Sequence, residues 1–138
     1  MTKRFLITLA LCCLFPIADL ALPAGYSPVS VAQAAAWYSG GNLHDANALQ
    51  WQKASYENKL ATCADFVANF WVNKNFKPGL QEAIKNVDDI KPFAKALVEA
   101  LDTALEKDPD AKKNMQMYGN IKVAEAAAML VHMMGWMK

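Results

Sequence analysis

The sequence predicts an all-α protein, a small bundle of four or five helices in a single domain. Apolar residues recur at steps of three, four and seven, which is the spacing of one helix face. No segment alternates apolar and polar residues with the β-branched content that is typical of a strand. A domain of about 100 residues has a small core, so the packing of these helices must bury its apolar surface.

The first helical pattern begins at about Leu43 and ends before the turn residues 73–75 and 78–79. Its apolar face comprises Leu49, Tyr56, Leu60, Cys63, Val67 and Phe70. Asn42 or Asp45 is expected to cap its start, because either side chain accepts a hydrogen bond from a free amide of the first turn. Before it, Ser39-Gly40-Gly41 is expected to form a flexible break.

A short second helix over residues 80–87 and a longer third helix that ends near Lys107 are expected next. The apolar stripe of the third helix comprises Ile90, Phe93, Ala94, Leu97, Leu101, Ala104 and Leu105. Asp88 and Asp89 place negative charge at the positive end of this helix, and Lys107 lies at its negative end.

The last helical pattern covers residues 109–138 and is expected to be interrupted at Gly119-Asn120. Pro109 suits the first position of a helix, where no backbone N–H is required. Residues 121–137 are rich in Ala, Met and Leu, which favour helices.

The N-terminus has the pattern of a signal peptide. Lys3 and Arg4 precede a run of about 11 mostly apolar residues, which is too short to span a bilayer of about 30 Å. Ala32-Gln33-Ala34 provides the small residues that a cleavage site needs, and Ala24 is a poorer alternative. The sequence therefore predicts a signal peptide over residues 1–34, a mature domain over residues 35–138, and export to the periplasm or the medium.

The cysteines and the charges narrow the function classes. A lipid anchor at Cys12 or Cys13 is disfavoured because Leu11 is not small, so no stable membrane anchor is expected. Cys63 is the only cysteine after residue 34, and its apolar neighbours favour a buried thiol over an intermolecular disulfide. The mature domain has no arginine and its acidic residues almost balance its lysines, so nucleic acid is not expected as a partner.

No catalytic motif stands out, so the chain is expected not to be an enzyme and to need no cofactor. His44 and His132 lie near opposite ends of the mature domain. A reactive loop formed by Ser39 with His44 and Asp45 is less favoured than a flexible turn, and a small hydrolase is kept as a third alternative. The acidic pairs Asp88-Asp89 and Asp108/Asp110 stand at expected helix starts, where carboxylates cap helices.

Met129, His132, Met133 and Trp136 share one face of the last helix. Thioether and imidazole groups are ligands that a cuprous or silver ion prefers, so a soft-metal site is an alternative interpretation. The neighbouring face is also apolar and comprises Ala127, Leu130, Met134 and Met137. Because methionine at helical spacing usually packs in a core or forms an adaptable contact surface, a packing or partner-contact face is favoured over a metal site.

Four aromatic residues near the start of the mature domain, Trp37, Tyr38, Trp51 and Tyr56, are candidates for partner binding. Aromatic side chains often anchor interfaces. The alternative is that Trp37 and Tyr38 fold back and close the bundle.

A short string resembles a known family. The segments that carry the resemblance are Thr62-Cys63-Ala64-Asp65-Phe66-Val67, Asn75-Phe76-Lys77-Pro78 and Glu82-Ala83. They are similar to the small periplasmic acid-stress chaperones of the HdeA/HdeB type, over residues 62–113. The resemblance implies a helical dimer that exposes apolar surface in acid and holds unfolding clients. The family uses one internal disulfide; Cys63 matches its first cysteine, but residues 98–101 lack the second, and the helical segment before Cys63 is additional.

The favoured hypothesis is therefore an exported protein that acts by binding protein partners, with the acid-stress chaperone as its most concrete form. Protonation of the carboxylates would leave a strongly positive chain whose self-repulsion destabilises the folded state. The oligomeric state, with a homodimer among the options, stays open.

Overall fold

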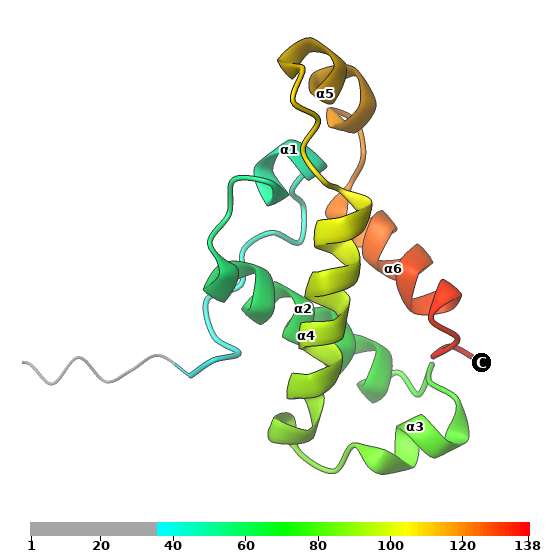
Figure 1. Cartoon of the computed structure of the whole chain (residues 1–138). Coiled ribbons are helices and arrows are strands. Elements are labelled where there is room, and N and C mark those ends of the chain that lie inside the picture. Colours follow the sequence, from blue (N-terminus) through cyan, green and yellow to red (C-terminus); the bar gives the residue numbers. More distant parts are fainter. Residues whose placement is uncertain (1–35) are drawn as a thin grey trace, which may run out of the picture. The chain divides into compact units, whose positions relative to one another are not determined.

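All secondary structure in the described part of the chain is helical, as predicted. A computed structural model describes residues 36–138; the expected signal peptide, its cleavage sites, Cys12 and Cys13 lie outside this range. Its helices are α1 (Ala48–Trp51), α2 (Tyr56–Val72), α3 (Pro78–Ala83), α4 (Val87–Ala104), α5 (Ala111–Tyr118) and α6 (Val123–Met133) (Figure 1). None of these helices is both long enough and apolar enough to cross a membrane.

The long helix expected from Leu43 is instead two helices, α1 and α2, which is why the described residues hold six helices rather than four or five. The N-cap of α1 is Asn47 and not Asn42 or Asp45. The Asn47 side chain accepts from Gln50 N at 3.0 Å, and the Gln50 side chain accepts from Asn47 N at 2.9 Å. Ser55 then caps α2. Each of these N-caps starts its own helix, and α1 ends at Trp51, although the apolar spacing continues across the break.

The second expected helix is shifted toward the N-terminus and lies at Pro78–Ala83. Ile84 is extended and only 2 % exposed, and Asn86 caps α4 by accepting from the N–H groups of Asp88 and Asp89. Val87 consequently belongs to α4 rather than to the second helix. Asp88 and Asp89 occupy the first turn of α4, where their negative charge is favourable, as expected.

The interruption expected at Gly119-Asn120 is confirmed, because α5 ends at Tyr118 and α6 begins at Val123. The start of α5 differs from the prediction. Asp110 caps this helix by accepting from the N–H groups of Lys112 and Lys113 at 2.9 and 3.0 Å, so Pro109 precedes the helix instead of opening it.

The core forms where α4 packs against α2 and α6 (Figure 1). The predicted stripe of α4 is buried at Ile90, Ala94, Leu97 and Leu101, with Val98 beside it and Leu105 just after the helix. On α2 the buried residues include Leu60, Cys63 and Val67, as predicted. Tyr56 and Ala104 lie at helix ends and are exposed, so the apolar pattern overestimates the buried face there.

The C-terminal segment leaves the direction of α6 and lies along the loop between α2 and α3. Gly135, with a φ of +71°, makes the turn. Lys77 N then donates to Trp136 O at 2.9 Å, and Lys138 N donates to Asn75 O at 3.0 Å. The Trp136 ring meets Phe76 and Phe93 edge to face at centroid distances of 6.3 and 5.5 Å, which places it on the core and not on the outer face of α6.

Candidate functional site

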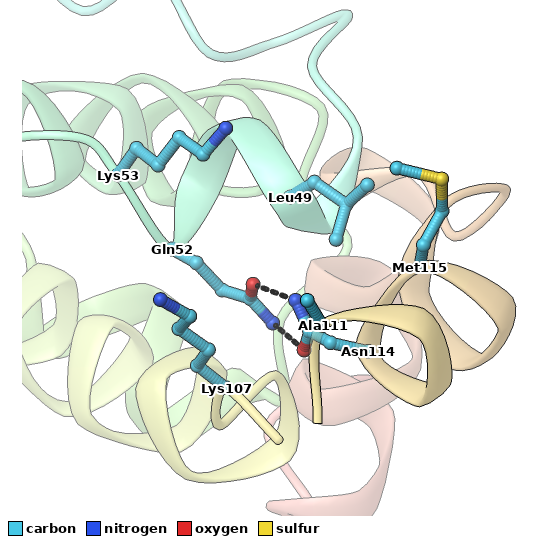
Figure 2. A pocket seen from close by; sticks show the side chains of 7 residues that line it. All are labelled: Leu49, Gln52, Lys53, Lys107, Ala111, Asn114 and Met115. Atoms are coloured by element: carbon cyan, nitrogen blue, oxygen red, sulfur yellow. Dashed lines mark hydrogen bonds between the residues drawn. The ribbon is translucent and has the colours of Figure 1, made fainter. Parts of the chain in front are cut away.

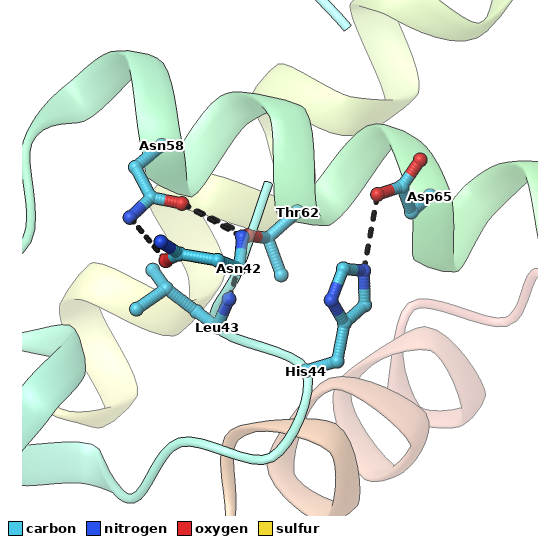
Figure 3. Close-up of polar contacts among 6 residues, drawn as sticks. All are labelled: Asn42, Leu43, His44, Asn58, Thr62 and Asp65. Carbon is cyan, nitrogen blue, oxygen red and sulfur yellow. Dashed lines mark hydrogen bonds and ion pairs between the residues drawn. The ribbon is translucent and has the colours of Figure 1, made fainter. Parts of the chain in front are cut away.

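Three consecutive residues before α1 lie along one face of α2 (Figure 3). Asn42 pairs with Asn58, Leu43 with Thr62 and His44 with Asp65, at donor–acceptor distances of 2.7 to 3.3 Å. Gly41 passes so close to α2 that a Cβ there would lie 2.6 Å from Thr62 N. Because positions 58, 62 and 65 share a helix face, the segment is fixed in a single register.

His44 does not form the grouping that a hydrolase would need. Its Nε2 lies 3.0 Å from Asp65 Oδ2, and the two side chains are 41 % and 50 % exposed. The ring also meets Phe66 edge to face at 5.5 Å. Neither Ser39 nor Asp45 is a hydrogen-bond partner of His44 in the described residues, so the arrangement is a surface His–Asp pair without an attached nucleophile.

The four aromatic candidates for partner binding do not form one surface. Trp51 is 1 % exposed and belongs to the core, so its side chain is not on a surface that a partner could contact in the folded chain. Tyr38 and Tyr56 are 39 % and 51 % exposed. Trp37 is half-buried, packs against the core and donates from Nε1 to Asp88 Oδ1 at 3.3 Å, in line with the bundle-closing interpretation. A groove of about 430 Å³ is lined by Ala36, Trp37, Ser39, Tyr56, Glu57 and Leu60.

Trp51, Lys59 and Asp102 form what we call the Asp102 cluster. Asp102 Oδ1 accepts from Trp51 Nε1 at 2.9 Å and pairs with Lys59 Nζ at 2.8 Å. Lys59 Nζ also lies 5.3 Å from the Trp51 ring centroid, a cation–π contact. The Lys59 side chain is only 14 % exposed, so one carboxylate of α4 neutralises a mostly covered cation of α2 and holds α1 in place. The sequence pattern did not reveal this cluster, because its members lie 43 and 51 residues apart.

Cys63 is free and buried, as predicted. Burial raises the pKa of its thiol far above the ordinary value, and the negative charge of Asp102 raises it further, against the opposing effect of Lys59. A thiol held in its neutral form is a poor nucleophile and a poor metal ligand.

In the form that begins at Ala35, we expect thiol reagents to label Cys63 at least about 10³-fold more slowly under native conditions than in denaturant. Labelling requires an opening that costs several kcal/mol, and each 1.4 kcal/mol is tenfold. A stopped-flow or mass-spectrometric time course measures this ratio. An exposed Lys95→Cys thiol in a Cys63→Ala background is the matched control and should react at the free-thiol rate. Equal rates for both thiols would show that Cys63 is accessible.

A cavity of about 280 Å³ lies where α5 meets α1 (Figure 2). At its wall the amides of Gln52 and Asn114 pair face to face, with N–O distances of 3.1 and 2.8 Å. Gln52 also donates to Leu105 O, and Asn114 accepts from Asp108 N. These amides satisfy one another, so the Gln52–Asn114 pair fastens α5 to the bundle and is not itself an unpaired anchor for a ligand.

The outer methionines of the last helix are not packed in the core, so the expectation of burial is wrong, while a partner-contact face stays a prediction. Met129 and Met133 are 60 % and 71 % exposed, and His132 between them is also exposed. The buried face of α6 is instead formed by Val123, Ala126, Ala127 and Val131. Trp136 lies apart from the three, on the core. Among residues 36–138, no three His, Cys, Asp or Glu side chains are grouped as metal ligands.

In comparisons with known proteins, no family model, no curated protein and no solved structure matches the chain.

Proposed function

We propose that the chain is an exported, non-catalytic protein that binds partly unfolded protein clients after acid loosens its N-terminal half. The observation that carries this proposal is the Asp102 cluster. A single carboxylate is the ion-pair partner of the mostly covered Lys59 and the hydrogen-bond acceptor of the buried Trp51. The contacts of α1 and α2 with α4 therefore meet at one acidic side chain, whose charge Lys59 needs.

Protonation of Asp102 removes the counter-ion of Lys59. A mostly covered cation without a partner is strongly destabilising, and it regains hydration when α1 and the segment before it separate from α2. That separation would expose Trp51, Leu43 and Leu60, which are 1 %, 7 % and 6 % exposed in the folded chain. Large apolar side chains that become accessible together provide a surface for an unfolding client.

The overall charge acts in the same direction. Of the 14 basic residues, Lys3 and Arg4 precede residue 35, which leaves 12 lysines; of the 13 acidic residues, Asp19 precedes it, which leaves 12. Once the carboxylates are protonated, the 12 lysines remain positive and repel one another.

Asp108 contributes to the same loss of stability in acid. Its hydrogen bonds from Lys113 Nζ and from Asp110 N hold the pKa of its carboxyl below the usual value. Because the folded-state pKa is lower than the unfolded-state one, Asp108 stabilises the fold above its unfolded-state pKa. This stabilisation is lost as the pH falls through the folded-state pKa.

The resemblance to the acid-stress chaperones supports the proposal through the strings in α2 and α3. Cys63 stands at the position of the family's first cysteine, but here it is a free, buried thiol. The described segment before α2 is therefore held by packing, by its hydrogen bonds to α2 and by the Asp102 cluster, and not by a disulfide at Cys63.

Asp102→Asn tests the proposal, because asparagine keeps an oxygen that can accept from Trp51 but removes the charge that Lys59 needs. We expect the variant to lose about 2 kcal/mol at pH 7. This is less than the 3–5 kcal/mol of a fully buried pair, because Asp102 is partly exposed. At pH 7 it should also bind a hydrophobic dye and suppress the aggregation of a denaturing client, which the wild type should do only in acid.

Glu99→Gln is the matched control, because it removes an equal charge from an exposed position of α4, three residues before Asp102. It should keep the wild-type profiles from pH 7 to pH 2. A wild-type protein that fails to suppress client aggregation at any of these pH values would contradict the function. An Asp102→Asn profile identical to that of the wild type would contradict the role of the cluster.

A further inference from the structure

The methionines of this chain are concentrated near its C-terminus and lie outside the core. Apart from Met1, all of them lie within residues 115–137, and none of these six is buried. Methionine is ordinarily among the residues most often found inside a protein. Met129 and Met133 stand out further, because they are 60 % and 71 % exposed on the same helix.

The spacing on α6 brings three soft or borderline donors together. His132 follows Met129 by three residues, and Met133 follows it by four. The Cβ atoms of His132 and Met133 therefore each lie about 5–6 Å from the Cβ atom of Met129, on one helix face. No residue in the described range hydrogen-bonds to the His132 ring, whereas His44 is paired with Asp65. Within residues 36–138, therefore, neither ring nitrogen of His132 has a hydrogen-bond partner, and both can be considered as metal ligands.

We propose that Met129, His132 and Met133 bind one monovalent soft cation, Cu⁺ or its redox-inert analogue Ag⁺. Two thioethers and one imidazole match the preference of such ions and are poor ligands for Mg²⁺ or Ca²⁺. The site lies in the last turns of α6, where the partial negative charge of the helix end attracts a cation. No carboxylate is required, in agreement with the lack of a His, Cys, Asp and Glu cluster among residues 36–138.

A protein partner is the competing occupant of this face. Met129 borders a groove of about 370 Å³ together with Ile121 and Leu130. However, exposed Lys122 and Glu125 flank the methionines on the N-terminal side, which leaves a narrow apolar strip. A stable interface buries about 800 Å² on each partner, with aromatic anchors at its centre, and α6 offers none on this face. The unbonded imidazole between two thioethers favours the metal.

The test follows the methionine methyl and histidine ring resonances by NMR while silver nitrate is added at pH 7. The full chain carries Cys12→Ala and Cys13→Ala, so that thiols outside the described residues cannot bind silver. Cys63 is kept in every variant. We expect the Met129 and Met133 methyl groups and the His132 ring to shift together and to saturate at one equivalent, while Met115 and Met117 stay unchanged.

Three variants test which side chains bind the silver ion. Met129→Leu with Met133→Leu keeps the side-chain volumes and the fold, and should abolish the shift of His132. His132→Gln should weaken binding more than about 10-fold, since even the outer-shell partners of metal ligands change affinity by about 10–100-fold. Met115→Leu with Met117→Leu removes two other exposed thioethers that have no histidine at helical spacing, and should leave binding intact.

Other outcomes would overturn the proposal. Equal shifts of Met115 and Met117 would show unselective thioether binding. Unchanged Met129 and Met133 signals would show that there is no site. Shifts of these signals with protein concentration or with an added peptide, and none with silver, would assign the face to a second copy or to a client.

Discussion

Leu97→Asp is expected to abolish the cooperative folding of the chain. Leu97 is 0 % exposed, lies in the middle of α4 and belongs to the core that α4 forms with α2 and α6. An unpaired carboxylate at this position costs several kcal/mol or takes up a proton, and the lost leucine packing adds to that cost. The sum approaches the roughly 5–15 kcal/mol that stabilises a typical domain.

Thermal unfolding followed by circular dichroism measures this effect, and the variant should show no cooperative transition. Lys95→Asp introduces the same residue two positions away on the exposed side of α4 and is the matched control. It should unfold cooperatively within a few degrees of the wild type. A Leu97→Asp protein that also melts within a few degrees of the wild type would show that the α4 stripe is not core.

Trp51→Ala should have the second largest effect. The indole is 1 % exposed, so its removal leaves a large cavity that costs about 3–5 kcal/mol, and Asp102 also loses the Nε1–H donor. For a domain of about 100 residues, each kcal/mol lowers the melting temperature by about 4–8 °C. We therefore expect the melting temperature to fall by roughly 12–40 °C.

Trp51→Phe keeps a six-membered aromatic ring in the core but removes the pyrrole ring and its hydrogen bond to Asp102, so it should cost less than Trp51→Ala. The lost hydrogen bond should account for about 1–2 kcal/mol of this cost. Trp37→Ala deletes an indole that is only half-buried and should fall between the two. If Trp51→Ala were no more destabilising than Trp37→Ala, α1 would not depend on the core.

The candidate sites were only partly accessible from the sequence. The grouping of Met129, His132 and Met133 follows from helical spacing alone, but whether that face points inward or outward does not. Ala126, Ala127 and Val131 are short enough to let α6 approach α4, and they take the buried face. The longer methionines are left outside, which reverses the expectation of burial.

The sequence by itself determined the all-α class, the buried stripe of α4, the burial of Cys63 and the break at Gly119-Asn120. All four depend on residues within a few turns of one another, where periodicity and chain-breaking residues act directly. Only the tertiary structure decided the division of the first helix, the docking of His44 on Asp65 and the Asp102 cluster. The last two join residues 21 to 51 positions apart, and the free energy of such contacts depends on geometry that is set only when the helices pack.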